Sequence, residues 1–250
     1  MESLIGVGPV ELALVFLVVA IASLLRSFTG FGFALAAVPG FSLLFAPTDA
    51  VVLSACLALS ISFFSLPTYW QHASIKPMAP MLAMAALTTI IGASLLSYIS
   101  VRMFQVLIST SIFIALLGLL LNKASSGRES TLLQCIAGAA SGLMNGVLAI
   151  PGPPVIAYAM LTQPDPRRSR AMLMVFFMLS ALIGLASYFF AGFVRGEMLL
   201  VFLLALPTLY VFDKLGYALF LRYSNEFYRT ASIWLLFGMG LSIGVKAWSG

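Results

Sequence analysis

The sequence predicts an all-α membrane protein with about eight transmembrane helices in two homologous halves, each with a broken or re-entrant segment. Its 250 residues are 62% hydrophobic and only 8% charged, and the mean hydropathy of +1.09 lies far above that of soluble domains. Apolar runs of about 20 residues match the length of a helix that crosses roughly 30 Å of hydrocarbon. The alternating pattern of an outer-membrane barrel is absent.

The long apolar runs are interpreted as membrane-crossing helices. No basic region precedes the first run, and that run is long enough to span, so we expect it to remain in the protein instead of being cleaved as a signal peptide. The predicted spans are 9–28, 49–70, 77–98, 103–122, 131–149, 169–192, 196–217 and 228–247.

Two breaks in the apolar pattern occur at corresponding places. Residues 30–33 lead to a Val-Pro-Gly sequence at 38–40, and residues 142–146 lead to a proline-rich stretch at 150–154. Such breaks indicate the substrate site of a transporter, because unwound backbone at membrane depth is tolerated where it lines a cavity. We expect the two breaks to meet near the bilayer midplane. The predicted division is a first repeat over 1–122, a linker over 123–130 and a second repeat over 131–250.

The number of crossings decides how the repeats are related. If both broken segments re-enter and return, each half has four crossings and the repeats are parallel; if both cross, the count is five and the repeats are inverted. With eight spans, the positive-inside rule places both termini outside. The more basic loops would then hold Arg102, Arg167, Arg168, Arg170, Arg222 and Arg229, and the opposite loops Lys76, Lys123, Arg128 and Arg195.

The charge and cysteine content narrow the range of partners. We attribute the formal net charge of +5 to basic residues that anchor loops to lipid headgroups. Cys56 and Cys135 lie in apolar runs and are expected to pack as small hydrophobes. The expected partners are a small anionic substrate and membrane lipid, with no nucleic acid, no metal and no cofactor. A homodimer is compatible with these expectations.

Candidate substrate-binding residues lie at the two breaks. Free backbone N–H groups at the start of a broken helix can replace the water shell of an anion, and glycine lets the anion approach the backbone closely. Close helix packing is the alternative role for the glycines. Packing is also the expected role of the small-residue stripes that contain Ser62 and Ser65, and Ser180 and Gly184. The candidates are Thr29, Gly30, Phe31, Gly32, Asn145, Gly146, Gly152, Pro153, Pro154 and Tyr158.

Three charged residues stand within or beside apolar runs. Arg26 lies next to the first break, where a cation is costly, and its planar fork of donors suits carboxylate or sulfonate oxygens. The alternative is that Arg26 snorkels to the headgroups. Lys214 is a candidate for attracting the anion, and Asp213 is a candidate for carrying a coupling proton. A structural charge pair near the interface is the alternative for these two.

Other function classes have less support. The chain has no Gly-x-Ser-x-Gly motif, no His-Glu-x-x-His motif and no paired acids, so an enzyme is not expected. An anion channel whose re-entrant segments form a filter remains the alternative to a secondary transporter.

Three stretches carry a family resemblance. They are the doubled Gly/Pro break, the sequence at 141–146 that leads to Gly-Pro-Pro-Val-Ile-Ala-Tyr at 152–158, and the closing segment at 206–229. Together they resemble the sulfite exporter TauE/SafE family over nearly the whole chain. The resemblance implies a multi-pass transporter of the bacterial inner membrane that carries sulfite, sulfoacetate or a similar small anion. The family usually has adjacent glycines in its first break; here phenylalanines alternate with Gly30 and Gly32, which leaves substrate size and polarity open.

Overall fold

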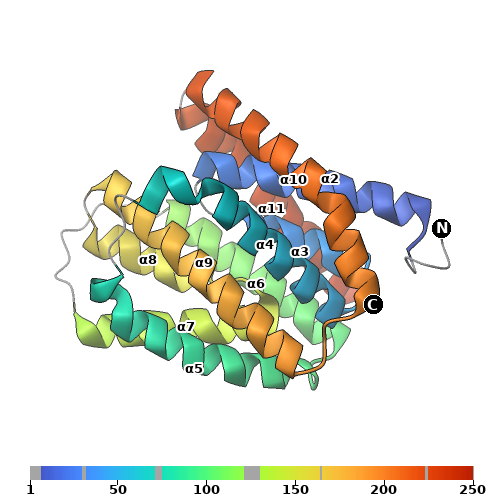
Figure 1. The fold of residues 1–250 in the computed structure, drawn as a ribbon, viewed down its shortest axis with the longest axis horizontal. Coiled ribbons are helices and arrows are strands. Elements are labelled where there is room, and N and C mark those ends of the chain that lie inside the picture. Colours follow the sequence, from blue (N-terminus) through green and yellow to red (C-terminus); the bar gives the residue numbers. More distant parts are fainter. Residues whose placement is uncertain are drawn as a thin grey trace.

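The structure is a computed structural model that describes residues 7–29, 32–70, 75–120, 130–163, 165–222 and 225–249. Within these ranges every regular element is a helix (Figure 1). The helices are α2 Pro9–Thr29, α3 Phe33–Ser42, α4 Pro47–Tyr69, the 3-10 helix η2 Lys76–Met78, α5 Ala79–Leu96, α6 Val101–Leu120, α7 Thr131–Leu148, α8 Gly152–Thr162, α9 Pro166–Phe190, α10 Gly196–Arg222 and α11 Asn225–Ser249.

Each predicted span overlaps one long helix, and each predicted break contains one short helix, α3 or α8. Six helices in the described ranges are long and apolar enough to cross a membrane. The all-helical class, with several helices long and apolar enough to cross a membrane, is therefore confirmed, whereas the count of eight spans and the division into two homologous halves stay predictions. The six stretches are Pro9–Ser27, Pro47–Pro67, Lys76–Leu96, Thr131–Leu148, Arg168–Phe190 and Gly196–Leu219.

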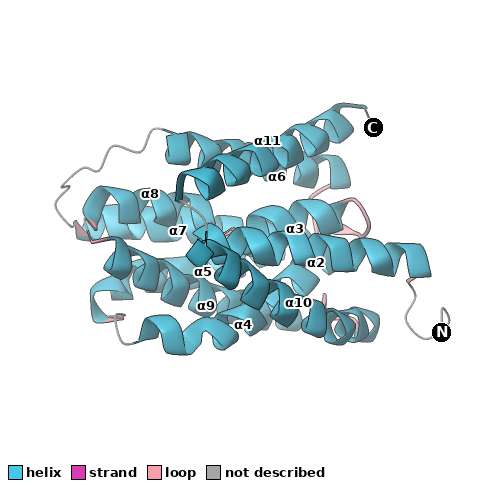
Figure 2. Cartoon of the chain, turned by 90° about the horizontal axis from the view of Figure 1, so that it is seen from above, coloured by secondary structure: helices cyan, strands magenta, loops and turns pink. Residues whose placement is uncertain are grey.

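The two short helices lie inside the bundle. α3 contacts α4, α6 and α11 as well as α2, and α8 contacts α6 and α9 as well as α7. In Figure 2 the layer that holds α3 and α8 lies between the pair α6 and α11 on one side and α4 and α9 on the other. The interrupted backbone is thus enclosed by protein, which is the arrangement that a bilayer would require at membrane depth.

Helices α5 and α7 pack closely and run in the same direction. Three glycines of α7 face the α5 backbone, and a Cβ atom at any of them would collide with it, so small residues set the distance between these helices. Successive positions of α7 meet successive positions of α5, which makes the pair parallel. The pairs in contact are Gly138 with Met81, Gly142 with Ala85 and Gly146 with Thr89.

Two other pairs run in opposite directions. In α6 and α11, the rings of Phe113 and Phe237 meet edge to face at 6.1 Å, and the Ser109 hydroxyl donates to the Gly240 carbonyl at 2.9 Å. The later residue of α6 thus meets the earlier residue of α11. In the same way, Tyr69 at the end of α4 packs on the early part of α9.

These directions sort the basic residues by end of the bundle. The end of α4 and the starts of α5, α7 and α9 lie together, and Lys76, Arg168 and Arg170 belong to that end, which we call the basic end. Arg102 begins α6 at the opposite end, and Arg195 lies there just before α10. The grouping of Arg102 with Arg168 and Arg170, expected for eight alternating spans, is therefore wrong, because α8 returns the chain to the basic end between α7 and α9.

Candidate functional site

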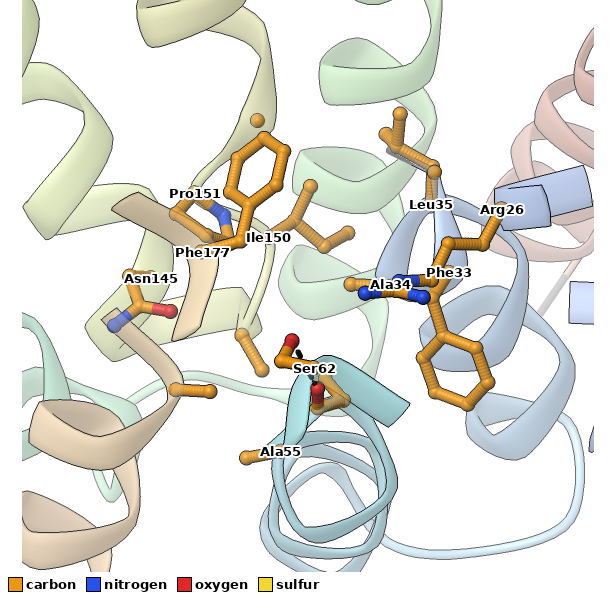
Figure 3. Close-up of a pocket in the computed structure, with 15 residues that line it drawn as sticks. Arg26, Phe33, Ala34, Leu35, Ala55, Ser62, Asn145, Ile150, Pro151 and Phe177 are labelled. Atoms are coloured by element: carbon orange, nitrogen blue, oxygen red, sulfur yellow. Dashed lines mark hydrogen bonds between the residues drawn. The ribbon is translucent and has the colours of Figure 1, made fainter. Parts of the chain in front are cut away.

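The two breaks meet at one buried cavity, which we call the central cavity (Figure 3). Its volume is about 50 Å³, space for a few water molecules at roughly 10–15 Å³ each. The first break contributes residues 32–35, and the second contributes residues 149–152. Helices α4 and α9 complete the wall with Ala55, Ala58, Ser62, Phe177 and Ala181.

Both short helices begin at this cavity. Gly32 caps α3 with φ of 105°, a left-handed conformation that glycine adopts without strain. α8 starts at Gly152, directly after Pro151. Ala149, which ends α7 in the cavity wall, also has positive φ, at 54°, and so carries local backbone strain. The starts of two helices thus direct the positive ends of their dipoles toward a common space.

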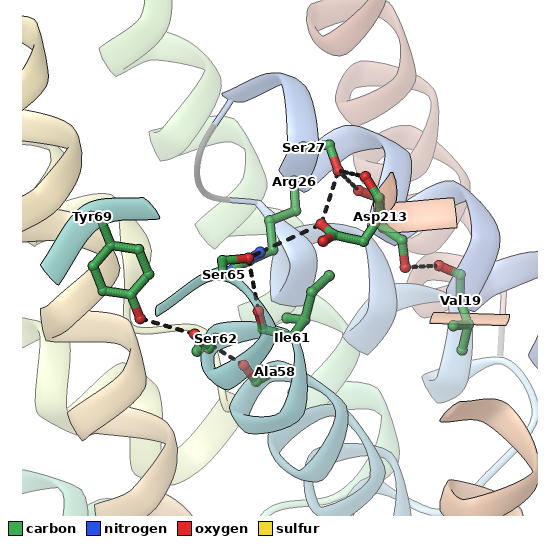
Figure 4. Close-up of polar contacts among 10 residues, drawn as sticks. Val19, Arg26, Ser27, Ala58, Ile61, Ser62, Ser65, Tyr69 and Asp213 are labelled. Atoms are coloured by element: carbon green, nitrogen blue, oxygen red, sulfur yellow. Dashed lines mark hydrogen bonds and ion pairs between the residues drawn. The ribbon is translucent and has the colours of Figure 1, made fainter. Parts of the chain in front are cut away.

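Arg26 reaches the central cavity from the last turn of α2. Arg26 is only 6% exposed to solvent. The guanidinium Nη1 donates to the Ser65 hydroxyl at 3.0 Å and lies 3.6 Å from Oδ1 of Asp213 (Figure 4). The Ser27 hydroxyl in turn donates to the same Asp213 oxygen at 3.0 Å. Arg26 is therefore held inside the protein and does not snorkel to the surface.

Asn145 occupies the matching place at the second break. Its side-chain Nδ2 donates to the Ser180 carbonyl at 2.8 Å and to the Thr89 hydroxyl at 3.3 Å. The Tyr188 hydroxyl donates to the Asn145 main-chain carbonyl at 2.6 Å. Asn145 lines the central cavity and also ties α7 to α5 and α9, so it has a structural role there in addition to any contact with substrate.

The charged pair of α10 separates into two environments. Asp213 pairs with Arg26, not with its neighbour Lys214. Lys214 is exposed, and its Nζ lies 5.6 Å from the centre of the Tyr210 ring, within cation–π range. Lys214 lines a second pocket, to which Arg26 and Asp213 also belong. The structure therefore places Lys214 beside the central cavity but outside its wall.

Some predicted site residues lie away from the cavity wall. Tyr158 is buried, and its hydroxyl accepts a hydrogen bond from Nε2 of Gln134 at 3.0 Å. Gly146 packs against α5. Pro153 and Pro154 occupy the first turn of α8, where prolines suit a helix start because no partner for an N–H is needed. Of the remaining candidates, Gly30, Phe31 and the Thr29 side chain lie outside the described residues.

Sequence reasoning missed the contributions of α4 and α9. Ser65 binds Arg26, Ser62 lines the central cavity, and the Ser180 carbonyl accepts from Asn145. Both helices carry stripes of small residues, which were attributed to packing. The stripes were a usable signal, because they mark the helix faces that meet the two breaks.

This arrangement defines a class of protein: a helical membrane protein in which two interrupted segments enclose a buried, cationic cavity. A family profile described as Sulfite exporter TauE/SafE matches residues 15–243. The chain therefore belongs to the sulfite exporter TauE/SafE family, which is a family of membrane transporters of sulfite and related anions and not of enzymes. A search of curated proteins and a search of solved structures each found no match to the chain.

Proposed function

We propose that the protein is a secondary transporter that moves a small sulfur oxyanion or organosulfonate across the bacterial inner membrane, with the central cavity as its binding site. The observation that carries this proposal is the convergence of Arg26 and the starts of α3 and α8 on one buried cavity. The Arg26 guanidinium, the backbone N–H groups at the start of α3 and the N–H group of Gly152 supply donors of the kind that an oxyanion loses when it leaves water; Pro153 and Pro154 have no N–H group to add.

The size of the cavity favours a compact anion. About 50 Å³ suits sulfite, with its four heavy atoms, better than a longer organosulfonate. Phe33 and Phe177 are among the side chains that bound this space. We therefore propose sulfite as the first substrate to test, with C2 organosulfonates expected to require a wider state of the cavity.

The pattern of helix contacts supports an inverted repeat. In such a repeat each helix of α2–α6 corresponds in order to one helix of α7–α11, so that α5 corresponds to α10 and α7 to α2. The neighbouring pair α5 and α7 then corresponds to α10 and α2, which are also neighbours. The remaining contacts fit the same correspondence, because α4 packs against its own counterpart α9 and α6 packs against its own counterpart α11. Equivalent helices that pack in opposite directions are expected when the pseudo-two-fold axis lies in the membrane plane. We propose this relation for the repeats 1–122 and 131–250.

The basic end is proposed to face the cytoplasm. The positive-inside rule assigns the end with Lys76, Arg168 and Arg170 to that side. Both termini then lie outside, since α2 starts and α11 ends at the opposite end. This is the same terminus orientation as expected from the sequence, with a different grouping of loops.

Transport is tested with purified protein in proteoliposomes. We expect saturable uptake of [³⁵S]sulfite that accelerates when unlabelled sulfite is inside, because exchange through one alternately accessible site is the mark of a carrier. Arg26→Gln should strongly reduce the flux at low sulfite concentration, while Arg102→Gln, a substitution of an exposed residue at the opposite end of the bundle, should leave it unchanged. Large ohmic anion currents without exchange would identify a channel instead.

A further inference from the structure

A second pocket lies between the central cavity and the basic end. It is enclosed by α2, α4, α9 and α10, and its volume is about 90 Å³. Arg26 lines both spaces, and the new pocket adds Arg170, Asp213 and Lys214. We call this space the basic pocket.

Cations outnumber carboxylates among the residues that line the basic pocket. Arg26, Arg170 and Lys214 carry positive charge, and Asp213 carries the single negative charge. Asp213 is already within 3.6 Å of Arg26 and accepts a hydrogen bond from Ser27. A positive excess at a pocket concentrates anions that approach from water.

The basic pocket and the central cavity are adjacent, since the Arg26 side chain lines both. Arg170 lies in the second turn of α9, close to the basic end. Phe177, in the wall of the central cavity, lies about 10 Å further along the same helix at 1.5 Å per residue. The guanidinium of Arg26 is shared by the two spaces and can bind an anion in either.

We infer that the basic pocket is a second anion-binding site, at which a small oxyanion docks and displaces Asp213 from Arg26 before it reaches the central cavity. This inference rests on the proposed function for the identity of the anion. Asp213 is then an internal counter-ion: it holds the place of the anion in the empty protein. The ligand is a sulfate- or phosphate-like group, whether free in solution or on a lipid headgroup.

Binding of [³⁵S]sulfite to the detergent-purified full chain tests the number of sites. We expect two sites per chain in the native protein. Lys214→Gln should weaken one of them about tenfold and leave the other unchanged, since it removes one charge-assisted contact from the basic pocket only. The matched control is Lys76→Gln, an exposed lysine of the basic end outside the pocket, which should change neither site.

Asp213→Asn provides a test with the opposite sign. Asparagine keeps the shape of the side chain and an oxygen for the Ser27 hydroxyl, but it cannot compete as a charge for Arg26. Sulfite affinity at the basic pocket should therefore increase about tenfold. Unchanged or weaker binding in a folded Asp213→Asn protein would overturn the counter-ion role.

Added lipid distinguishes the two sources of the anion. If the headgroup is the natural occupant, phosphatidylglycerol should displace sulfite from the Lys214-dependent site, and native mass spectrometry should find lipid retained by the native chain but not by Lys214→Gln. If the free anion is the occupant, phosphatidylglycerol should leave both sites filled.

The outcomes also separate this inference from the transport proposal. Two sites with no flux in proteoliposomes would refute transport and keep the basic pocket. A single sulfite site that is insensitive to Lys214→Gln, without retained lipid, would overturn the basic pocket even if transport is observed.

Discussion

The two breaks have a polar side chain at equivalent positions, but the two side chains differ in chemistry: one is a charged arginine and the other a neutral asparagine. Arg26 precedes Gly32, which caps α3, by the same number of residues as Asn145 precedes Pro151, which caps α8. Each side chain contacts two long helices. One of them is the helix that packs closely against the helix carrying the side chain. Arg26 contacts Ser65 of α4 and Asp213 of α10, whereas Asn145 contacts Ser180 of α9 and Thr89 of α5.

The difference teaches that, among the described residues, the charged side chain in the wall of the central cavity comes from the first half. At the first break the contact is an ion pair, which an incoming anion can exchange for itself. At the second break the contact is a set of neutral hydrogen bonds between α7, α5 and α9, which no anion replaces. We infer that the first break supplies affinity and the second break supplies the fixed wall against which the anion rests.

Removing the charge at the first break should have the largest effect. Arg26→Gln removes the nearest cation from the Asp213 carboxylate, whose side chain is 13% exposed. Breaking a fully buried pair costs about 3–5 kcal/mol of stability, and this partly exposed pair should cost less. It also removes a charge-assisted contact to the anion, worth about 1.5–3 kcal/mol or roughly tenfold to a hundredfold in affinity. Thermal unfolding and sulfite binding on the same preparation measure the two losses.

The double variant Arg26→Gln/Asp213→Asn separates these two effects. With neither charge of the pair present, most of the stability should return, because the double variant leaves neither the guanidinium nor the carboxylate without its partner. The affinity for sulfite should not return. Recovery of native sulfite transport in this variant would show that backbone dipoles alone bind the anion and would remove the functional difference between the two breaks.

Removing the polar side chain at the second break should have a smaller effect, mainly on stability. Asn145→Ala deletes two hydrogen bonds of the Nδ2 group, worth about 0.5–1.5 kcal/mol each. We expect a lower unfolding temperature and a sulfite affinity that falls less than in Arg26→Gln. Thr110→Ala, which removes an exposed hydroxyl bonded to its own helix, is the matched control. An affinity loss as large as that of Arg26→Gln would contradict the division of roles.

The sequence was sufficient to locate the helices and both breaks. The helix predicted at 131–149 is α7, Thr131–Leu148, in the structure. The glycines and prolines of the two breaks predicted interruptions where α3 and α8 begin. These features depend on local hydrophobicity and on the backbone properties of Gly and Pro, which are encoded within a few residues.

Partners across helices could not be predicted in this way. Arg26 and Asp213 are far apart in the chain, and their pairing depends on the packing of α2 against α10. Tyr158 was expected at the cavity by its spacing from Pro154, but the rotation of α8 directs it to Gln134. Hydropathy fixes where a helix lies along the chain and leaves its rotation and its neighbours open.

The smallest structural change should occur at Gly152, where packing and binding roles can be separated. A Cβ atom there would meet only the flexible Cδ1 of Ile156 at 3.3 Å and the Phe177 ring at 4.0 Å. Its backbone needs no positive φ, so Gly152→Ala should fold with little loss of stability. The added methyl group would stand in the cavity at the start of α8, where it keeps an anion from the backbone N–H group of Gly152. Sulfite transport should therefore fall strongly in a monodisperse, thermally stable protein.

Gly146→Ala is the matched control, because the same methyl group there would collide with the α5 backbone at Thr89. Overpacking of this kind costs about 1–3 kcal/mol, so folding and transport should decline together in Gly146→Ala. The two substitutions add the same atoms within one break and differ only in what those atoms meet. Full transport by a well-folded Gly152→Ala protein would mean that the anion does not approach the start of α8, and the binding role would then rest on Arg26 and the start of α3.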